Sequence, residues 1–485
     1  MSGTGQTPTS QDVLMTDAQD HEGIATILAK GTDVEILECD KTGNIRTKWL
    51  HTADDRVIPT GSTKSNNLIF RSIRGWRQAI SDSFLPVGFP HSVSDDYLAY
   101  QTYDSLQAFF STITSLLANR ALLEGLGVGD ANSSATFAML LTILKDAMSR
   151  VATIVFAHRF GLRIEPDAKR YRFLADLFND TAFFLELYSP YLGSLGKVFA
   201  LSTGEALRAL CGVAAGASKA ALSVHFAKHD NLAELNAKEA SQETAVGLVG
   251  LLVGTLVVKF VEEPISVISL MVALVFGHLW VNYLGVCSVH MTTLNRQRAT
   301  ILFHEYLETG RVLTPSEVAK KENILFWDSA VPNRNGQRVA RIEFAEGYHH
   351  ARDFPKGETK VFLVDGPMHT KFIGTRLKDG LTTIRILLWD RAEPARAIVA
   401  WFSAMEIAWM MNRGEGYSVK LDRVICGPDT GAVAGGDKPA AFEKRYCDAQ
   451  LWEKMVARGW DVESQAFETG PPVRVRVQPA IRKNE

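Results

Sequence analysis

The hydrophobic pattern of this chain has its strongest feature near the middle, where two long apolar stretches follow one another. Residues 244–258 carry no formal charge, and residues 265–286 run for 22 positions without one. A helix of 22 residues extends roughly 33 Å, close to the hydrocarbon thickness of a bilayer. A soluble protein seldom needs two adjacent helices that are apolar on every face. With only Lys259 and the turn at residues 262–264 to interrupt it, the pattern predicts a helical hairpin that spans a membrane.

A helical period that begins at Tyr100 extends this prediction to a polytopic membrane bundle of about six helices. Glycines and prolines mark the breaks between the helices. The predicted helices are Tyr100–Leu126, Ser133–His158, Lys169–Tyr188, Ser194–Ala227, Ala240–Val261 and Ile265–Val286. Basic residues lie in the loop at residues 158–172 and just after the last helix, which places both on the cytosolic side. An even number of crossings then puts both termini in the cytosol, in a membrane whose organelle the sequence does not name.

Polar patterning returns on both flanks, so the fold is expected to be mainly α with small β regions. Val34–Cys39 and Ile45–Leu50 flank a Gly-containing turn and predict a β-hairpin. Residues 1–70 are expected to hold a disordered start and this hairpin, residues 71–300 the membrane domain, and residues 301–485 a cytosolic α+β domain.

In the last region, residues 314–317 form a capping box that predicts a short helix through Lys321. The other predicted elements there are strands at Val339–Phe344, Lys360–Val364, Lys371–Thr375, Thr382–Trp389 and Val473–Val477, helices at Pro394–Met411 and Lys444–Arg458, and a mobile Gly-rich insert at Gly427–Lys438.

Composition excludes few classes of protein. The 485 residues are 46% hydrophobic and 22% charged with a net charge of −2, and no basic stripe is interleaved with aromatic residues, which argues against a nucleic-acid partner. The five cysteines lie far apart without a CxxC motif and are expected to be unpaired thiols in a reducing compartment. The polar, acidic start resembles neither a secretion signal nor a transit peptide, so membrane insertion is expected to depend on the internal helices, with about the first 24 residues disordered.

The predicted helices carry charges that lipid would not tolerate. Lys145, Asp146 and Arg150 lie near the middle of the second helix, and three lipid-exposed charges there would cost on the order of 8–10 kcal/mol. We therefore expect them to face other helices or a watery cavity, with Asp146 paired to Arg150 four positions later. An acidic face on the third helix, containing Asp176, Asn179, Asp180 and Glu186, is expected to meet these bases. Three interpretations stay open: charges paired to stabilise the bundle, a position of the first four helices partly outside lipid, or a polar cavity that binds or passes a small polar or anionic solute.

Small residues predict close helix packing at two places. Gly212, Gly216 and Ala220 form a row on the fourth helix, and Gly250 and Gly254 form a GxxxG motif on the fifth.

Signals for catalysis, metals and cofactors are weak. His225 and His229 are spaced to share a metal, but no third ligand is evident, and a polar helix end that faces water is the better explanation. The glycines of residues 125–129 lack the strand and the Lys-Ser/Thr of a phosphate loop. His349 and His350 have no partner cluster. We therefore expect no metal, no cofactor and no enzymatic activity.

Several short motifs together resemble one known family. FLPVGFP at residues 84–90 continues through HSVSDDYLAYQTYDSLQAFFS, and LKDA, LADLFND and GASKAAL follow at residues 144–147, 174–180 and 216–222. NLAE, AKE and SQET complete the series at residues 231–234, 237–239 and 241–244. In this order they resemble the root UV-B-sensitive family over roughly residues 76–313, while the C-terminal region resembles that family's variable tail only loosely.

The resemblance implies a eukaryotic integral membrane protein that in plants is linked to UV-B tolerance, early development and vitamin B6 homeostasis. It supplies no catalytic residues, and the plastid location of plant members is not carried over. If the motif residues converge on a binding site or a polar network, the candidates are Asp104, Gln107, Lys145, Asp146, Arg150, Asp176, Asn179, Asp180, Lys219, Asn231, Lys238, Gln242 and Glu243.

Three functions remain as hypotheses. The first is a membrane protein, in contact with lipid, that binds or transports a small polar ligand, for which a pyridoxine-type vitamer is the leading candidate. The second is a membrane scaffold whose C-terminal domain, from about Leu302, recruits a protein partner or another copy of the chain. The third is a membrane-embedded enzyme, which has the least support because no catalytic constellation is present.

Overall fold

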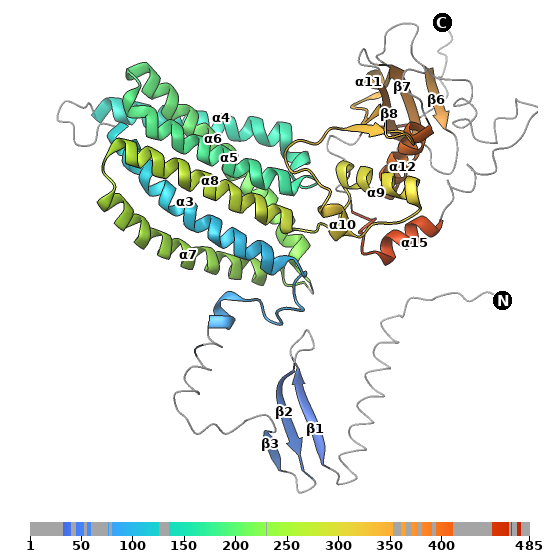
Figure 1. The fold of residues 1–485 in the computed structure, drawn as a ribbon, viewed down its shortest axis with the longest axis horizontal. Helices are drawn as coiled ribbons and strands as arrows, with labels where there is room; N and C mark the ends of the chain where they lie inside the picture. Colours follow the sequence, from blue (N-terminus) through green and yellow to red (C-terminus); the bar gives the residue numbers. More distant parts are fainter. Residues whose placement is uncertain are drawn as a thin grey trace, which may run out of the picture. The chain divides into compact units, whose positions relative to one another are not determined.

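The computed structural model describes residues 33–39, 45–52, 56–59, 76, 80–125, 135–228, 230–352, 360–364, 370–376, 381–389, 394–410, 449–464, 467 and 473–476. The chain divides into two compact units, Met1–Asp95 with Ala227–Gln242, and Asp96–Phe226 with Glu243–Glu485. Helices make up most of the described part (Figure 1). The predictions for the first 24 residues, for residues 126–129 of the glycine-containing segment, for His229 and for the Gly-rich insert fall outside the described residues.

Six helices of more than 20 residues lie in the described part, at nearly the predicted positions. They are α3 Tyr97–Gly125, α4 Ala135–Ile164, α5 Ala168–Tyr188, α6 Ser194–Phe226, α7 Leu232–Phe260 and α8 Pro264–Ser288. The largest difference is the start of α7 at Leu232 instead of Ala240. Hydropathy marked only the apolar part of that helix, whereas the preceding segment is polar but rich in Leu, Ala, Glu and Lys, which are strong helix formers. Helix α4 likewise continues past Gly161 and ends at Ile164, just before the Glu165-Pro166 step that disfavours helix.

Helix α5 lies at the centre of its group of helices, because it packs against α3, α6 and α8 (Figure 1). Helix α4 packs on α6, and α3 packs on α8. One buried apolar cluster includes Leu117, Phe183 and Met271, and a second includes Phe156 and Ala214. Residues from α3, α5 and α8 therefore meet on one side of α5, and residues from α4 and α6 meet it on the other.

The two rows of small residues behave differently. Gly250 and Gly254 face α3, and a Cβ atom added at Gly250 would lie 2.9 Å from Thr112 Cβ, so the GxxxG motif does permit close packing. The row on α6 does not: Gly212, Gly216 and Ala220 are exposed, and a Cβ added at either glycine would meet nothing within 4 Å. The prediction that this second row packs within the chain is wrong, because α6 turns its opposite face, with Ala214 and Ser218, toward its neighbours.

Three of these helices are long and apolar enough to cross a membrane, namely α6, α7 and α8. Little of their apolar surface is buried inside the protein, and α7 has the smallest buried share at 11% of its most apolar window.

The N-terminal sheet belongs to the first unit. Strands β1 (Val34–Cys39) and β2 (Ile45–His51) pair antiparallel, with Val34 opposite His51, which confirms the predicted hairpin. A third strand, β3 (Val57–Pro59), pairs antiparallel with β2 and was not predicted.

The region after α8 combines helices with a mixed sheet. Its elements are α9 Arg296–Thr309, α10 Pro315–Ala319, β4 Ala330–Pro332, β5 Arg338–Phe344, α11 Tyr348–Arg352, β6 Lys360–Val364, β7 Thr370–Arg376, β8 Thr382–Trp389, α12 Pro394–Met410, α15 Ala449–Ala457 and β9 Arg474–Val475. The strand order is β4-β5-β8-β7-β6, with β9 beside β8. Strands β5 and β8 are parallel, β8 and β9 are parallel, and the other pairs are antiparallel.

Most of these elements match the prediction, including the capping box, in which Thr314 and Glu317 exchange hydrogen bonds. The short helix ends at Ala319 rather than Lys321. Helix α9 was missed, although Asn295 caps it by accepting a hydrogen bond from the Arg298 amide and Gly310 ends it in a left-handed conformation. Its apolar face, with Leu302 and Phe303, joins a core that surrounds Trp401 of α12.

Candidate functional site

Helix α5 carries a polar stripe on the face that it turns toward α3 and α8. Arg172, Asp176 and Asp180 are spaced four residues apart, so they lie above one another on one side of the helix. Asp176 and Asp180 are buried, and only 11% of the Arg172 side chain is exposed. Buried charges at such spacing have to find partners on the neighbouring helices.

Arg172 joins α5 to α3. Its Nη2 atom lies 2.6 Å from Asp104 Oδ1, its Nε donates to the Tyr100 hydroxyl at 3.1 Å, and its Nη1 lies 3.6 Å from Asp176 Oδ1. The Arg172 Nη2 also donates to Gln107 Oε1 at 3.4 Å. The planar guanidinium therefore contacts residues of both α3 and α5 through separate N–H groups, which fixes the relative register of the two helices.

Asp176 joins α5 to both α3 and α8. Its Oδ2 accepts hydrogen bonds from Gln107 Nε2 on α3 and from Asn282 Nδ2 on α8. Asn282 also donates to the Arg172 carbonyl at 3.4 Å. We refer to Asp104, Gln107, Arg172, Asp176 and Asn282 as the buried cluster. Three of the predicted site residues meet here.

One turn further along α5, Asp180 pairs with His278 of α8. The Asp180 Oδ2 and His278 Nδ1 atoms are 2.8 Å apart, and the two side chains are only 2% and 1% exposed. Within the described residues, Asp180 Oδ1 and His278 Nε2 are buried without a hydrogen-bond partner. We refer to these two residues as the acid–histidine pair.

The buried cluster and the acid–histidine pair contain more acid than base. Asp104, Asp176 and Asp180 supply three carboxylates, while Arg172 supplies one guanidinium. With all three carboxylates ionised and His278 neutral, the net charge would be 1 − 3 = −2, which burial makes costly. The site therefore favours an additional positive charge, either a proton on His278 or on a carboxyl group, or a bound cationic group.

A further polar contact lies on the other side of α5. Arg208 of α6 binds both carboxylate oxygens of Glu186, and its Nη1 approaches Asn179 Oδ1 at 3.5 Å. Glu186 is nearly fully buried, and the Arg208 guanidinium lies 4.8 Å from the centre of the Phe183 ring. This bidentate pair couples α5 to α6, so Asn179 contacts a different group of residues from Asp176 and Asp180.

The expected meeting of α5 acids with α4 bases does not occur. The acids of α5 pair with groups on α3, α6 and α8, and Lys145 of α4 lies 3.2 Å from Glu205 of α6. Asp146 and Arg150 are exposed, and no ion pair joins them among the described residues. The expectation that they face inward is wrong, because consecutive helix residues point about 100° apart, and the face of α4 that packs on α6 contains Lys145 rather than Asp146.

The remaining predicted residues lie outside the buried cluster. Lys219 forms an ion pair with Glu243. In the first unit, Asn231 donates to the Ser92 carbonyl at 3.0 Å, Lys238 to the Asp82 carbonyl and Gln242 to the Phe84 carbonyl. These three side chains hold the segment of residues 82–92 against the start of α7. The motif residues at the start of α7 therefore bind backbone carbonyl groups of that segment.

Sequence reasoning missed Arg172, His278 and Asn282. Arg172 was counted among the basic loop residues, and His278 and Asn282 lie in the most apolar helix, where they add no formal charge. Their position in the sequence could have identified His278 and Asn282. A histidine and an asparagine inside an otherwise apolar span are costly in lipid and therefore need a polar partner.

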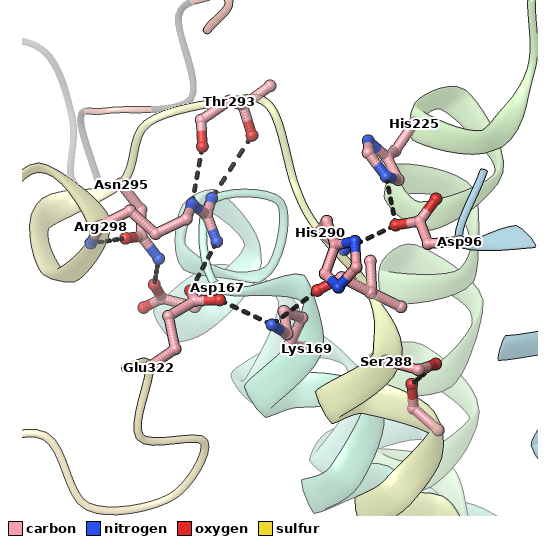
Figure 2. Close-up of polar contacts among 12 residues, drawn as sticks. Asp96, Asp167, Lys169, His225, Ser288, His290, Thr293, Asn295, Arg298 and Glu322 are labelled. Atoms are coloured by element: carbon pink, nitrogen blue, oxygen red, sulfur yellow. Dashed lines mark hydrogen bonds and ion pairs between the residues drawn. The ribbon is translucent and has the colours of Figure 1, made fainter. Parts of the chain in front are cut away.

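A second polar network lies at the end of α8 and joins α5 to the segment that follows (Figure 2). Lys169 Nζ lies 2.6 Å from Glu322 Oε2 and donates to the Val289 carbonyl at 2.9 Å. Arg298 Nη1 binds Glu322 Oε1 at 3.1 Å, and Asn295 donates to Asp167 at 2.9 Å. We refer to Asp167, Lys169, Asn295, Arg298 and Glu322 as the ion-pair network; a cavity of about 30 Å³ beside it has room for roughly one water molecule.

The balance between burial and the neighbouring basic side chains determines the pKa values of the carboxyl groups in the ion-pair network. Burial alone would raise the pKa of Glu322, but Lys169 and Arg298 outweigh burial and hold that pKa below its usual range. Burial raises the pKa of Asp167 because Arg298, Arg170 and Arg296 offset it only in part. Glu322 is therefore the ionised carboxylate to which both bases are anchored.

The same region contains a smaller histidine group (Figure 2). Asp96 Oδ2 lies 3.0 Å from His225 Nε2 and accepts a hydrogen bond from the His290 backbone amide at 2.6 Å. Burial lowers the pKa of the His290 imidazole, opposed by Asp96 and reinforced by Lys169 and His225. The structure thus gives His225 a carboxylate partner, and among the described residues no group of three or more His, Cys, Asp or Glu side chains is placed to hold a metal.

Comparisons with known proteins identify the family. The sequence profile of the vitamin B6 photo-protection and homoeostasis domain matches residues 71–310. RUS family member 1 of Dictyostelium discoideum is 40% identical over 272 residues, which cover 55% of this chain and 52% of that protein. Protein root UVB sensitive 3 of Arabidopsis thaliana is 33% identical over 428 residues, or 87% of this chain and 91% of that protein. The chain belongs to the root UVB sensitive family.

This membership confirms the resemblance that the sequence motifs carried. The matched region of the root UVB sensitive chain contains all of the buried cluster, the acid–histidine pair and most of the ion-pair network. The chain spans about half of the Dictyostelium relative. Protein root UVB sensitive 2, chloroplastic, of Arabidopsis thaliana is 28% identical over 268 residues, 54% of this chain and 60% of that protein. No solved structure matches the chain.

Proposed function

We propose that this root UVB sensitive protein is an integral membrane protein in which α3 to α8 form a six-helix bundle. Large apolar side chains point outward, such as Leu252 at 65% and Phe276 at 70% exposure, while the Arg172, Asp176, Asp180 and Glu186 side chains of α5 point inward. A helix in water buries its apolar face, whereas a helix in lipid exposes it and turns its costly polar groups toward other helices. This arrangement, with the three apolar helices α6, α7 and α8, supports lipid around those helices, whereas the exposed Asp146 and Arg150 of α4 need water or another protein surface beside them.

The proposed topology places both termini in the cytosol. Arg159, Arg163 and Arg170 lie near the α4–α5 connection, whereas the α7–α8 turn contains Glu262 and Glu263. Under the positive-inside rule, the first connection is cytosolic and the second lies on the opposite side. The ion-pair network and the C-terminal region then share the cytosolic side with the α4–α5 connection.

Within this bundle, we infer a binding and transport site for a small polar solute at the buried cluster and the acid–histidine pair. The observation that carries the proposal is the unpartnered Asp180 Oδ1 and His278 Nε2, both buried between apolar helices. His278 is 14 residues from the start of α8 and 10 from its end, so the pair lies near the middle of the span. An ionisable pair at that depth is a functional position by default, because lipid gives no other reason to retain it.

The charge of the site narrows the class of solute. Three carboxylates against one guanidinium favour a neutral or protonated amine or pyridine and disfavour a phosphorylated compound. Together with the vitamin B6 homoeostasis domain that matches the chain, this supports pyridoxine or pyridoxamine as the solute. In this proposal, a proton on the acid–histidine pair accompanies the solute.

The test is binding and vesicle uptake of pyridoxine and pyridoxamine by the purified full chain. Asp180→Asn should abolish uptake, while Asp146→Asn, which removes an exposed carboxylate of α4, should leave uptake unchanged. Asp180→Asn should stay folded because the amide keeps one acceptor oxygen for His278. Asp146→Asn should stay folded because Asp146 is exposed. Absence of binding by a folded wild-type protein, or equal loss in both variants, would contradict the proposal.

A membrane scaffold is the second candidate, and the C-terminal region supports it. That region builds its own apolar core around Trp401 and extends well beyond residue 310, where the family profile ends. Cross-linking of the full chain in membranes should then yield partner peptides, from another protein or another copy, attached to residues 311–485. Cross-links confined to the helical bundle would argue against this candidate. A membrane-embedded enzyme is third, and conversion of a vitamer by the purified protein would favour it.

A further inference from the structure

A second cavity lies between the end of α4 and the C-terminal sheet, away from the buried cluster. Its volume is about 510 Å³, within the range of small-molecule sites. It is lined by the last turns of α4, the start of α9, the end of β5 with the segment that follows, and the strands β8 and β9. The charged and titratable residues of its wall are His158, Arg159, Arg163, Arg296, Glu343, Glu346, His350 and Arg474.

The wall of this cavity is strongly basic. Four arginines and two histidines face two glutamates, and Glu343 is already bound by Arg385 at 2.6 Å. Among the described residues, neither Arg159 nor Arg163 has an acidic side chain within ion-pair distance. Charges of one sign that line a concave surface reinforce one another and attract a counter-ion. The partial negative charge at the C-terminus of α4 favours a basic residue in its last turns, and the cavity wall has two there, Arg159 and Arg163.

We propose that this basic cavity binds a phosphate-bearing anion. The guanidinium fork matches the geometry of phosphate oxygens and binds them through paired, charge-assisted hydrogen bonds. Arg159 and Arg163 are four residues apart and present two such forks from one helix face. Two sources offer this chemistry, the headgroup of an anionic phospholipid and a soluble phosphate ester, and an experiment with two arms separates them.

The solute proposed above is not phosphorylated, so the two sites differ in the charge that they select. The buried cluster has an excess of acid, whereas the basic cavity has an excess of base. Loss of one site therefore leaves the other testable.

The first arm measures retention of short-chain phosphatidic acid against phosphatidylcholine by native mass spectrometry of the full chain in detergent. The second arm measures binding of glycerol 3-phosphate and of inorganic phosphate by thermal shift. In at least one arm, the double variant Arg159→Gln with Arg163→Gln should weaken binding by about tenfold or more, since the anion loses the charge-assisted hydrogen bonds of two guanidinium groups. Arg159→Lys with Arg163→Lys should recover part of the affinity.

The matched control is Arg170→Gln with Lys320→Gln, which removes two exposed positive charges outside the basic cavity and should change binding by less than about twofold. Retention of phosphatidic acid alone identifies a lipid headgroup, and binding of glycerol 3-phosphate alone identifies a soluble ester. If the folded wild-type protein binds neither probe, or if the control and the glutamine variant lose binding equally, the proposal is overturned. Unchanged pyridoxine binding in the glutamine variant would show that the two sites are independent.

Discussion

Arg172 is the side chain on which the buried cluster depends. Its guanidinium contacts Tyr100, Asp104, Gln107 and Asp176 together. Each of these groups was removed from water when the helices packed, and an ion pair compensates that loss only while both charges are present. At the residue scale, the bundle is therefore most sensitive to loss of the positive partner.

Arg172→Met should destabilise the folded protein by about 3–5 kcal/mol, because Asp104 and Asp176 would be left as buried charges without a counter-charge. Asp104→Asn should cost less, since the amide oxygen still accepts from Arg172. Thermal unfolding of both variants in detergent measures the difference. Equal melting temperatures for Arg172→Met and the wild-type protein would show that the cluster does not stabilise the bundle.

His290 should contribute to the pH dependence of stability near neutrality. Burial lowers the pKa of its imidazole from the ordinary value of 6.5, so the folded state binds a proton less readily than the unfolded state. The stability contributed by His290 is thus present above pH 6.5 and is lost as pH falls through the lowered pKa. The drop in melting temperature from pH 7.5 to pH 5.5 should be smaller in His290→Gln than in the wild-type protein.

Exposed His349 supplies the control for this measurement. His349→Gln should retain the full drop of the wild-type protein. A similar reduction in both histidine variants would assign the effect to overall charge instead of the position of His290.

Among the helices, α7 is attached to the bundle through its small residues. Gly250 and Gly254 face α3, Val257 and Val258 pack on the apolar cluster that includes Leu117, and Glu243 pairs with Lys219 of α6. Small residues let two helices approach closely, which replaces the hydrophobic driving force that lipid does not supply. The close approach of α7 to α3 thus depends on the absence of a side chain at two positions.

Gly250→Leu should destabilise the attachment of α7 by about 1–3 kcal/mol, because the added Cβ would lie 2.9 Å from Thr112 Cβ and has no room to move. Gly216→Leu is the matched control, since a Cβ there meets nothing within 4 Å. Limited proteolysis and thermal unfolding in detergent compare the two. Equal effects would mean that α7 does not pack on α3 as described, or that another copy of the chain covers Gly216.

For the whole molecule, the topology depends on lipid around the bundle. In a variant without native cysteines, Glu262→Cys and Lys320→Cys introduce one thiol each, in the α7–α8 turn and in the segment after α10. In sealed vesicles, a membrane-impermeant thiol reagent should label the two variants from opposite sides. Labelling of both from the same side would contradict the proposed orientation, and release of the protein by alkaline carbonate would contradict membrane insertion.

The sequence alone determined which segments are helices and strands. Hydrophobic period, helix formers, prolines and glycines act over a few neighbouring residues, so the six helices, the hairpin, the capping box and strands such as β6 and β8 could be predicted. The main helical segments that the sequence analysis did not predict are α9 and the first eight residues of α7, because these segments are polar. The motifs that resemble the family also named Asp104, Gln107, Asp176 and Asp180 as candidates, and the structure places these side chains in the buried cluster and the acid–histidine pair.

Only the tertiary structure decided which of these candidates meet. The partner of a side chain depends on how the helices pack and on which face of its helix the residue lies. Because consecutive helix residues point about 100° apart, Lys145 faces α6 while Asp146 is exposed. The same geometry brings Arg172, Asn282 and His278 to the α5 stripe and leaves Gly212 and Gly216 without contacts. Local chain chemistry therefore determines the elements, and packing across distant segments determines the site.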